Sequence, residues 1–422
     1  MTQPGLGPLQ DGTTAVVIGG GPGGTAAAIT LRREAQRLGR NIRVVIIEEK
    51  HFAGERQHNQ CAGVLSPPVA ELITDELGVK FPFHLSQNEI TGYVLHTPHR
   101  QIVLDGETEP SIAFRRVQFD AYMLAAVEQY GVEVADGRVT DLEFHDDQVI
   151  VYTNSLPLQA DVVIGAFGMD EGAAMLFARA VGYRPPPALS SVVTKYHPSE
   201  AGMASFGQRI HAFLPPNPHI EFGAITPKAN HLTINIAGMA VDVHLMESFL
   251  ATPGVRANLP DLDNPENRHS RDLRFFKGRF PRGLARNISG NRFIMVGDAA
   301  GLVRAFKGKG VTSAIQTGIR AAQVILHEGI SGLAFEQYRI ANQDIIRDLP
   351  YGQAMRLLTI IAARTRLMEA AVLAAERDPH LRRALFDSVS AHRAYRDVVR
   401  EAFTPASMKS LLAGFIRTFR NQ

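Results

Sequence analysis

The sequence has few of the features that mark extracellular, nucleic-acid-binding or membrane-spanning proteins. Among its 422 residues there is one cysteine, Cys61, so no disulfide can form within the chain, as is usual in a reducing compartment. The formal net charge is only +2, and no dense basic run with interleaved aromatic residues is present. We therefore expect no nucleic-acid partner.

Long apolar runs are also missing. No uninterrupted apolar stretch reaches the roughly 20 residues that a bilayer-spanning helix needs. The first residues are polar and lack the basic and then apolar pattern of a secretory signal. These absences predict a cytoplasmic protein, and they leave peripheral contact with the inner face of a membrane open.

A glycine fingerprint stands near the start of the chain. An apolar strand leads into Gly19-x-Gly21-x-x-Gly24, and a helix-forming run follows directly. In this context Gly19 makes the tight turn, Gly21 lets a pyrophosphate approach the backbone, and Gly24 lets the helix pack against the strand. The diphosphate then meets the helix N-terminus, with Pro22 and Gly23 in the same loop.

Two further segments make this fingerprint specific. The next strand, residues 43–48, ends in Glu48, whose carboxylate is placed to bind ribose hydroxyls, and Glu49 follows it. Far downstream, another apolar strand runs into Gly297 and Asp298. Strand, helix and acidic residue together predict a bound dinucleotide rather than a ligand-free turn.

The order of elements predicts an α/β protein in three parts. A Rossmann-like, dinucleotide-binding domain is expected, with a β-rich α+β substrate domain inserted into it and a helical region at the C-terminal end. The boundaries that we expect are 13–91, 111–188 and 285–340 for the cofactor domain, 92–110 and 189–284 for the substrate domain, and 341–422 for the helical region.

Several motifs together resemble a known enzyme family. The glycine fingerprint, Arg116-x-x-Phe119-Asp120 and the late Gly297-Asp298 resemble the flavoprotein hydroxylase superfamily over residues 15–338. Within that superfamily, three features resemble the geranylgeranyl reductase family: the loop 59–67 around Cys61, Gly301 after two alanines, and the segment 221–228.

This resemblance implies a cofactor domain of the FAD-binding, glutathione-reductase type, with FAD bound in an extended conformation and no metal. Adenine would lie near Val139, the ribose on Glu48 and the pyrophosphate on the glycine loop. The flavin edge would lie at the start of the helix that follows residues 306–310, where free N–H groups and partial positive charge favour its reduced form. The full cofactor set that the resemblance implies is Gly19, Gly21, Pro22, Gly23, Gly24, Glu48, Glu49, Cys61, Ala62, Gly63, Arg116, Val139, Gly297, Asp298, Gly308, Gly310 and Val311.

Two residues are candidates for the chemistry itself. Lys309, just before the flavin-edge helix, either strengthens the stabilisation of reduced flavin or is a solvated loop lysine. Cys61 either has a role in the site or is a small buried hydrophobic residue. The site role would be to line the pocket, or to donate a proton to the carbon opposite hydride attack.

The chain departs from the family at two places. Where the reductases usually carry Tyr, Trp and Phe, it has Phe222, Ala224 and Thr226, followed by Pro227, so the substrate pocket is expected to be wider or differently shaped. Phe167 replaces an acidic residue in a segment associated with nicotinamide handling. The electron donor therefore stays open between NAD(P)H, ferredoxin and a quinol.

These features predict an FAD-dependent oxidoreductase of lipid metabolism. It would reduce carbon–carbon double bonds of a prenyl, or isoprenoid, chain or a similar apolar substrate by hydride transfer from flavin N5. An FAD-dependent aromatic or polyketide monooxygenase and a non-catalytic prenyl-lipid escort protein are the alternatives. The segment after Thr404 predicts a basic amphipathic helix, which either lies on a membrane or packs on the protein's own core.

Overall fold

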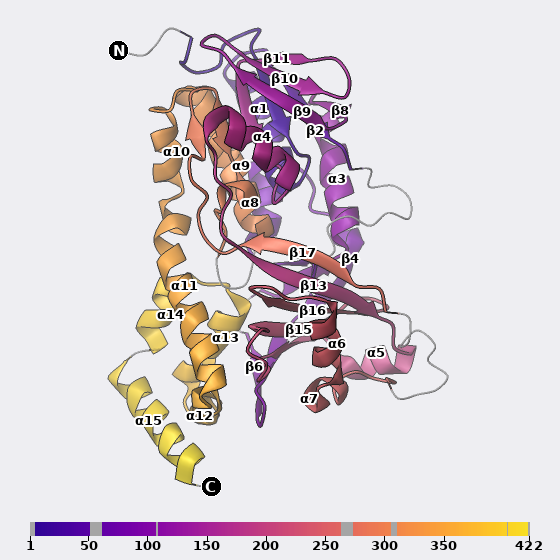
Figure 1. Ribbon diagram of the computed structural model, residues 1–422, viewed down its shortest axis with the longest axis vertical. Helices are drawn as coiled ribbons and strands as arrows, with labels where there is room; N and C mark the ends of the chain where they lie inside the picture. Colours follow the sequence, from indigo (N-terminus) through magenta and orange to yellow (C-terminus); the bar gives the residue numbers. More distant parts are fainter. Residues whose placement is uncertain are drawn as a thin grey trace.

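The computed structural model describes residues 5–50, 61–106, 109–262, 273–304, 310–402 and 404–420, and for 405–408 and 417–420 it describes the backbone alone. The chain forms an α/β part, a second sheet beneath it, and a column of C-terminal helices that runs beside both (Figure 1). The predicted mixed α/β class, with a parallel sheet and a helical C-terminal part, is confirmed at this level.

A six-stranded sheet forms the centre of the α/β part. Its order is β18-β19-β12-β1-β2-β8, and all neighbours run parallel except β18 and β19. The central strands are continuous buried apolar runs, as expected where helices cover both faces of a sheet. The strands are β1 (Thr14–Ile18), β2 (Arg43–Glu48), β8 (Glu133–Asp136), β12 (Val162–Gly165), β18 (Ser289–Gly290) and β19 (Phe293–Met295).

Helices α1 (Pro22–Arg37) and α9 (Gly310–His327) pack tightly against each other in this part. Their backbones approach so closely that a Cβ at Gly318 would lie 2.3 Å from the carbonyl oxygen of Gly23. The remaining elements of the α/β part are α3 (Arg116–Glu128), α4 (Glu171–Val181), α8 (Gly297–Ala300), α10 (Phe335–Ala341) and the small sheet of β9 (Val139–Phe144), β10 (Val149–Thr153) and β11 (Leu158–Ala160).

The second large sheet has seven strands in the order β17-β13-β16-β15-β14-β5-β6, and only β14 and β5 are parallel. One face carries a core of buried residues such as Ile225, Ile234 and Ile236. The strands are β5 (Gly92–His96), β6 (Gln101–Asp105), β13 (Ala188–Tyr196), β14 (Arg209–Phe213), β15 (Phe222–Pro227), β16 (Leu232–Gly238) and β17 (Phe276–Pro281), and short helices α5 (Glu200–Phe206), α6 (Val243–Ala251) and α7 (Pro253–Arg256) accompany them.

A third sheet joins the two parts of the molecule. It pairs β7 (Ser111–Phe114) with β3 (Val64–Leu65) on one side and β4 (Ser86–Ile90) on the other. The short helices α2 (Val69–Glu71), η1 (Leu72–Glu76) and η2 (Phe83–Leu85) lie between β3 and β4 along the chain. Val64 of β3 packs against the core cluster that residues of β5, β6 and β14 share.

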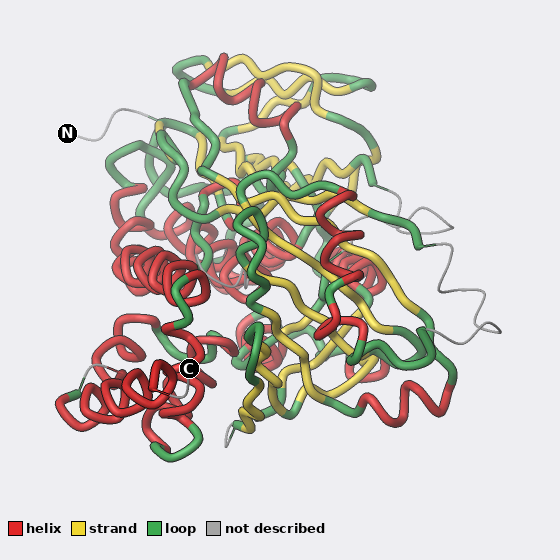
Figure 2. The backbone as a smooth tube through the Cα atoms, turned by 60° about the horizontal axis from the view of Figure 1, so that its bottom comes forward, coloured by secondary structure: helices red, strands yellow, loops and turns green. Residues whose placement is uncertain are grey.

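The C-terminal helices gather on one side of the strands (Figure 2). They are α11 (Gln343–Arg364), α12 (Leu367–Ala375), α13 (Pro379–Ser390), α14 (Tyr395–Ala402) and α15 (Pro405–Arg420). Phe386 of α13 meets the Tyr93 ring of β5 edge-on, with 5.9 Å between ring centroids. In the part of the chain that the structure describes, no helix is both long and apolar enough to cross a bilayer.

Helix α15 begins at Pro405, as the cap and proline predict. Leu411 packs against the core cluster shared by α12, α13 and β5, and Gly414 is buried against Ala370 of α12. Leu412 and Ile416 remain 61% and 50% exposed. One face of the helix therefore packs on the protein's own core, while the neighbouring apolar residues face outward.

Candidate active site

The carboxyl ends of four parallel strands open into one large cavity. Ile18 ends β1, Glu48 ends β2, and Ala166 and Val296 follow β12 and β19; all four line the cavity. Ligands of open α/β sheets bind at this edge, where connections leave in opposite directions. The cavity holds about 920 Å³, near the top of the roughly 300–1,000 Å³ typical of ligand pockets.

The glycine loop lies at one end of this cavity. Gly19, Gly21, Pro22 and Gly23 line it, whereas Gly24 does not. A Cβ at Gly24 would lie 2.0 Å from the carbonyl oxygen of Gly19, so this glycine serves the packing of helix on strand. A Cβ at Gly21 would meet no protein atom within 4 Å, which leaves room for a ligand to touch the backbone.

Glu48 is held at the same end by the backbone. Its Oε2 accepts a hydrogen bond from the Gly20 N–H at 2.8 Å, and its Oε1 accepts one from the Lys50 N–H at 2.9 Å. Glu49 and Val139 also line this end of the cavity. The arrangement fits a ribose and an adenine, since a fixed carboxylate meets hydroxyl groups beside an apolar wall.

Arg116 and Asp298 face the cavity from two different elements. The Arg116 guanidinium donates to both carboxylate oxygens of Asp120 at 3.1 Å. Burial disfavours the Arg116 charge, but Asp120, Cys61 and Asp298 together outweigh burial and raise the pKa of Arg116. Burial raises the pKa of Asp298 above its ordinary value, and Arg116 offsets part of that rise.

The start of α9 closes the cavity beyond Asp298. Gly310 and Val311 line it, together with Gly297, whose N–H donates to the Thr317 hydroxyl at 3.0 Å. Gly308 and Lys309, predicted for this site, lie outside the described residues. The described helix start therefore faces the cavity as the resemblance implies, and the role of Lys309 stays a prediction.

Cys61 is exposed and lines the cavity with Ala62 and Gly63. The alternative of a small buried hydrophobic residue is therefore wrong. Lys228 is buried close by, and its Nζ donates to the Phe114 carbonyl oxygen at 2.8 Å. Burial lowers the pKa of Lys228 to about 8, and Cys61 opposes that shift, which places its thiol within electrostatic range.

On the sheet side, strand alternation decides which predicted pocket residues reach the cavity. Phe222, Ala224 and Thr226 line it, whereas Pro227 does not, because alternate residues of a strand point to opposite faces. Pro227 does not line the described cavity, and its place in the substrate pocket stays a prediction.

Other lining residues on this side escaped the sequence analysis. They include residues of β13 and β17, together with Tyr93 of β5, Ile210 and Ala212 of β14, Asn235 of β16 and Val389 of α13. The only signal in the sequence is the alternation of β16, where Thr233 and Asn235 interrupt an otherwise apolar strand. Thr226 Oγ1, Thr233 Oγ1 and Asn235 Oδ1 are buried without a hydrogen-bond partner among the described residues, so this stretch of the pocket floor is polar.

Phe167 also lines the cavity. Its ring stacks on Phe177 at 5.4 Å and meets Tyr183 at right angles at 5.8 Å. An aromatic cluster thus occupies the place where the superfamily usually has an acidic side chain. Among the described residues, no three His, Cys, Asp or Glu side chains gather as metal ligands would.

No family model matches the sequence. Digeranylgeranylglycerophospholipid reductase 2 of Methanosphaera stadtmanae is 26% identical over 340 residues, covering 74% of this chain and 77% of the relative. A geranylgeranyl bacteriochlorophyll reductase-like protein from Thermoplasma acidophilum has the same fold, with a TM-score of 0.68 and 17% identity over 93% of this chain and 99% of its own.

The fold is also shared with flavoproteins of other chemistry. The flavin-dependent brominase Bmp2 superposes with a TM-score of 0.64 at 17% identity, over 92% of this chain and 99% of its own, and the halogenase PltM has been solved in complex with FAD. These relatives bear out the predicted resemblance to geranylgeranyl reductases.

Proposed function

We propose that this chain is an FAD-dependent oxidoreductase that reduces carbon–carbon double bonds in a prenyl or similar apolar substrate. One observation carries the proposal: a single cavity joins a dinucleotide-type glycine loop to a largely apolar sheet face. When bound and reduced, FAD supplies a hydride from N5. The reductase relative supports this chemistry over the other reactions of the fold.

In this proposal each end of the cavity has its own task. Glu48, Glu49 and Val139 hold the adenosine, and the glycine loop holds the pyrophosphate next to the N-terminus of α1. Asp298 and Arg116 hold the middle of the cofactor, while Gly310 and Val311 meet the flavin edge. The parallel-sheet part, 13–91, 111–188 and 285–340, is then the cofactor domain, and 92–110 with 189–284 is the substrate domain.

The substrate lies on the seven-stranded sheet in this proposal. Phe222, Ala224, Ile210 and Ala212 offer an apolar wall to a hydrocarbon chain, which is desolvated as it enters. Ala224 and Thr226 leave space where bulkier side chains stand in the reductases that the chain resembles, so a branched or thicker chain fits. The polar group at Thr226 favours a substrate that also carries an oxygen function.

We also propose the class of electron donor and a contact with a membrane. NAD(P)H, ferredoxin or a quinol would deliver electrons, and the aromatic cluster at Phe167 favours a donor that does not need an acidic residue at that point. The exposed Leu412, Phe415 and Ile416 of α15, beside Lys409, support peripheral contact of the C-terminal region with a membrane surface.

A flavin-dependent monooxygenase or halogenase is the second candidate, because proteins of both kinds share the fold. The requirement for O₂ distinguishes the reductase from a monooxygenase or halogenase. We expect the reduced protein to turn over a prenyl substrate under nitrogen, with no product that contains oxygen from O₂. Product formation that requires O₂ would favour the second candidate, and purified protein without flavin absorbance or affinity for FAD would contradict both.

A further inference from the structure

A chain of hydrogen bonds leads from the cavity into the C-terminal helices. Tyr93 of β5 lines the cavity, and its hydroxyl is hydrogen-bonded to Ser111 of β7. Ser111 Oγ lies 3.0 Å from Nε2 of His392 and 2.9 Å from Oγ of Ser66. Tyr93 is 6% exposed and Ser111 1%, so the chain runs through the interior and ends at the partly exposed His392.

The chain passes directly behind the start of α9. Thr312, in the first turn of that helix, donates to the Ser66 carbonyl oxygen at 3.3 Å. Val64 and Leu65, just before Ser66, line the cavity. If the flavin edge lies at this helix start, as proposed above, Tyr93 and Ser111 stand beside the reacting end of the site.

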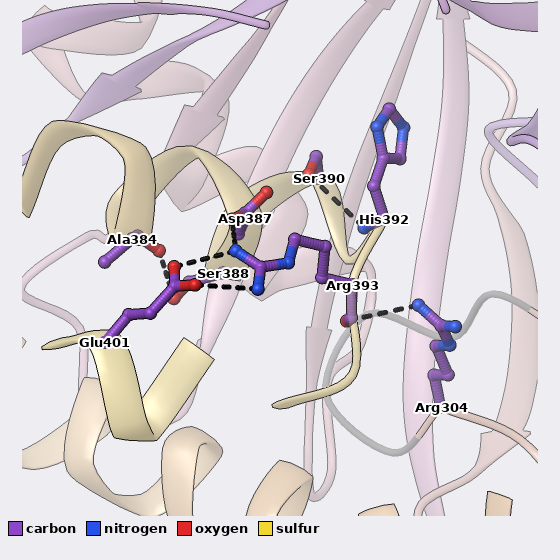
Figure 3. Close-up of polar contacts among 8 residues, drawn as sticks. All are labelled: Arg304, Ala384, Asp387, Ser388, Ser390, His392, Arg393 and Glu401. Carbon is purple, nitrogen blue, oxygen red and sulfur yellow. Dashed lines mark hydrogen bonds and ion pairs between the residues drawn. The ribbon is translucent and has the colours of Figure 1, made fainter. Parts of the chain in front are cut away.

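The far end of the chain is held by ion pairs. His392 lies in the connection from α13 to α14, and the next residue, Arg393, bridges Asp387 at 3.3 Å and Glu401 at 2.7 Å (Figure 3). Arg304 donates to the Arg393 carbonyl oxygen at 3.2 Å. The His392 ring points away from this charged group (Figure 3), and it meets the Phe386 ring edge-on with 5.8 Å between ring centroids.

Reduction of a double bond needs a proton as well as a hydride, and a positioned acid contributes about 10²–10⁴ to such a step. A buried phenol can serve only if its proton is restored after each turnover. Burial raises the pKa of Tyr93, and the hydrogen bond from Ser111 opposes that rise because it stabilises the phenolate. Imidazole is the side chain best suited to exchange that proton with water near neutral pH.

We propose that Tyr93 donates the proton in the double-bond reduction and that Ser111 and His392 relay its replacement from solvent. This inference rests on the proposed function. One carbon takes the hydride supplied by reduced FAD; the other forms its C–H bond with the Tyr93 proton as the O–H bond breaks. The phenolate then takes the Ser111 proton, and Ser111 takes the Nε2 proton of the His392 imidazolium, which water restores.

The test uses the FAD-loaded protein, reduced anaerobically, with a digeranylgeranylglycerophospholipid as the probe. We expect Tyr93→Phe to slow double-bond reduction about 100-fold with unchanged affinity for FAD. Ser111→Ala and His392→Ala should each slow it about tenfold, and the double variant no further, because both break one relay. Imidazole in the buffer should restore His392→Ala.

Tyr196→Phe is the matched control. It also removes a buried hydroxyl, which donates to the Pro260 carbonyl oxygen on the opposite face of the same sheet. A wild-type rate in Tyr93→Phe, or a loss in Cys61→Ala with Tyr93→Phe still active, would overturn the proposal and leave the reductase activity standing. A wild-type protein that reduces no prenyl probe would instead defeat the proposed function, and the relay with it.

A second measurement needs no cofactor. In protein labelled with ¹⁵N at histidine, the Nε2 signal of His392 should shift in Ser111→Ala and stay in place in Tyr196→Phe. An unchanged His392 signal in Ser111→Ala would overturn the relay whatever the kinetics show. If Tyr93→Phe does not fold, His392→Ala and its rescue by imidazole decide the question.

Discussion

The glycines of the fingerprint are required for different physical reasons. At Gly24 a Cβ would collide with the carbonyl oxygen of Gly19, so an alanine must push α1 away from β1. At Gly21 the surrounding space is open, and the backbone φ of −72° suits any residue. The open space is part of the cavity. A side chain at Gly21 would therefore obstruct a bound ligand and would not strain the fold.

We therefore expect Gly21→Ala to leave the free energy of unfolding of the cofactor-free protein within about 0.5 kcal/mol. Its affinity for FAD should fall about tenfold or more, which is about 1.4 kcal/mol. Gly24→Ala should lower the free energy of unfolding by about 1–3 kcal/mol. Denaturant unfolding and flavin titration of both variants provide the check, and equal destabilisation by the two would contradict this division of roles.

Asp298 lies in an environment that disfavours its ionised form. Because burial raises its pKa, the folded chain favours the neutral form, while the unfolded chain ionises near the ordinary value of 3.8. As pH rises above that value, the ionised carboxylate costs stability, and the cost levels off once pH passes the raised pKa. A ligand that offers hydroxyl groups would offset this loss of stability by hydrogen bonding to the Asp298 carboxylate.

Asp298→Asn should accordingly make the cofactor-free protein at least as stable as wild type at neutral pH. Its advantage should shrink as pH falls toward 3.8. Affinity for FAD should fall about tenfold, because an amide is a weaker acceptor for hydroxyl groups. Unfolding curves at several pH values test the first part, and a variant less stable than wild type at neutral pH would refute it.

Among the elements, α11 and β15 are joined by one buried ion pair. Arg356 of α11 donates from Nε to Glu221 Oε2 at 2.6 Å and from Nη2 to Oε1. The two side chains are only 15% and 7% exposed. Glu221 directly precedes Phe222, so this pair fixes the C-terminal helices against the strand that forms the pocket wall.

Removal of Arg356 would leave the Glu221 carboxylate buried without its partner. We expect Arg356→Ala to lower the free energy of unfolding by about 3 kcal/mol. The control is Arg339→Ala in α10, whose pair with Glu336 is 61% and 56% exposed and should matter by less than about 1 kcal/mol. Urea unfolding of the two variants measures both losses of stability. Similar decreases in the free energy of unfolding would contradict the assigned role of the buried pair.

Elements with strong local signals could be predicted from the sequence. Residues 92–105 alternate on both sides of Pro98 and form the hairpin of β5 and β6, and α15 begins at the proline that follows Thr404. The three-residue strand β11 has too few residues to show a period. Pro227 was assigned to the pocket from a motif, although the alternation of its own strand points it to the other face.

At the scale of the whole molecule, three of the described histidines in the seven-stranded sheet and its turns are held toward the neutral form; His96 and His231 are buried, and His211 is partly buried. Burial lowers the pKa of His96 and of His211 to about 4 and that of His231 to about 3. His96 Nε2 lies 3.0 Å from His211 Nδ1, a contact that a second proton would break. The unfolded chain binds these protons near pH 6.5, so protonation favours unfolding.

Stability of the wild-type protein should therefore fall as pH decreases from about 6.5 to 4, by on the order of 3 kcal/mol from the His96–His211 pair. His96→Gln should show a shallower fall over the same range, since one of the two protonations is gone. Thermal unfolding of both proteins across this pH range measures how steeply the stability of each falls. Parallel pH profiles for the two proteins would show that acid acts elsewhere.

Phe222, Ala224 and Thr226 of the sheet side could be predicted from a motif, but most of the predictable site lies on its cofactor side. There the glycine loop, Glu48 and Asp298 belong to local motifs, and the fold brings them to one edge of a sheet. The relay side has no such signal, because Ser111 and His392 are 281 residues apart. Their contact depends on how the C-terminal helices pack on the sheet, which no short pattern encodes.

The most direct test of the account is the fate of a double bond under nitrogen. The protein is loaded with FAD, reduced chemically and mixed with a digeranylgeranylglycerophospholipid, while flavin absorbance and product mass are followed together. We predict that the flavin is reoxidised as the lipid gains two hydrogen atoms for each flavin consumed. Flavin that stays reduced until air is admitted, with the lipid then unchanged or oxygenated, would contradict it.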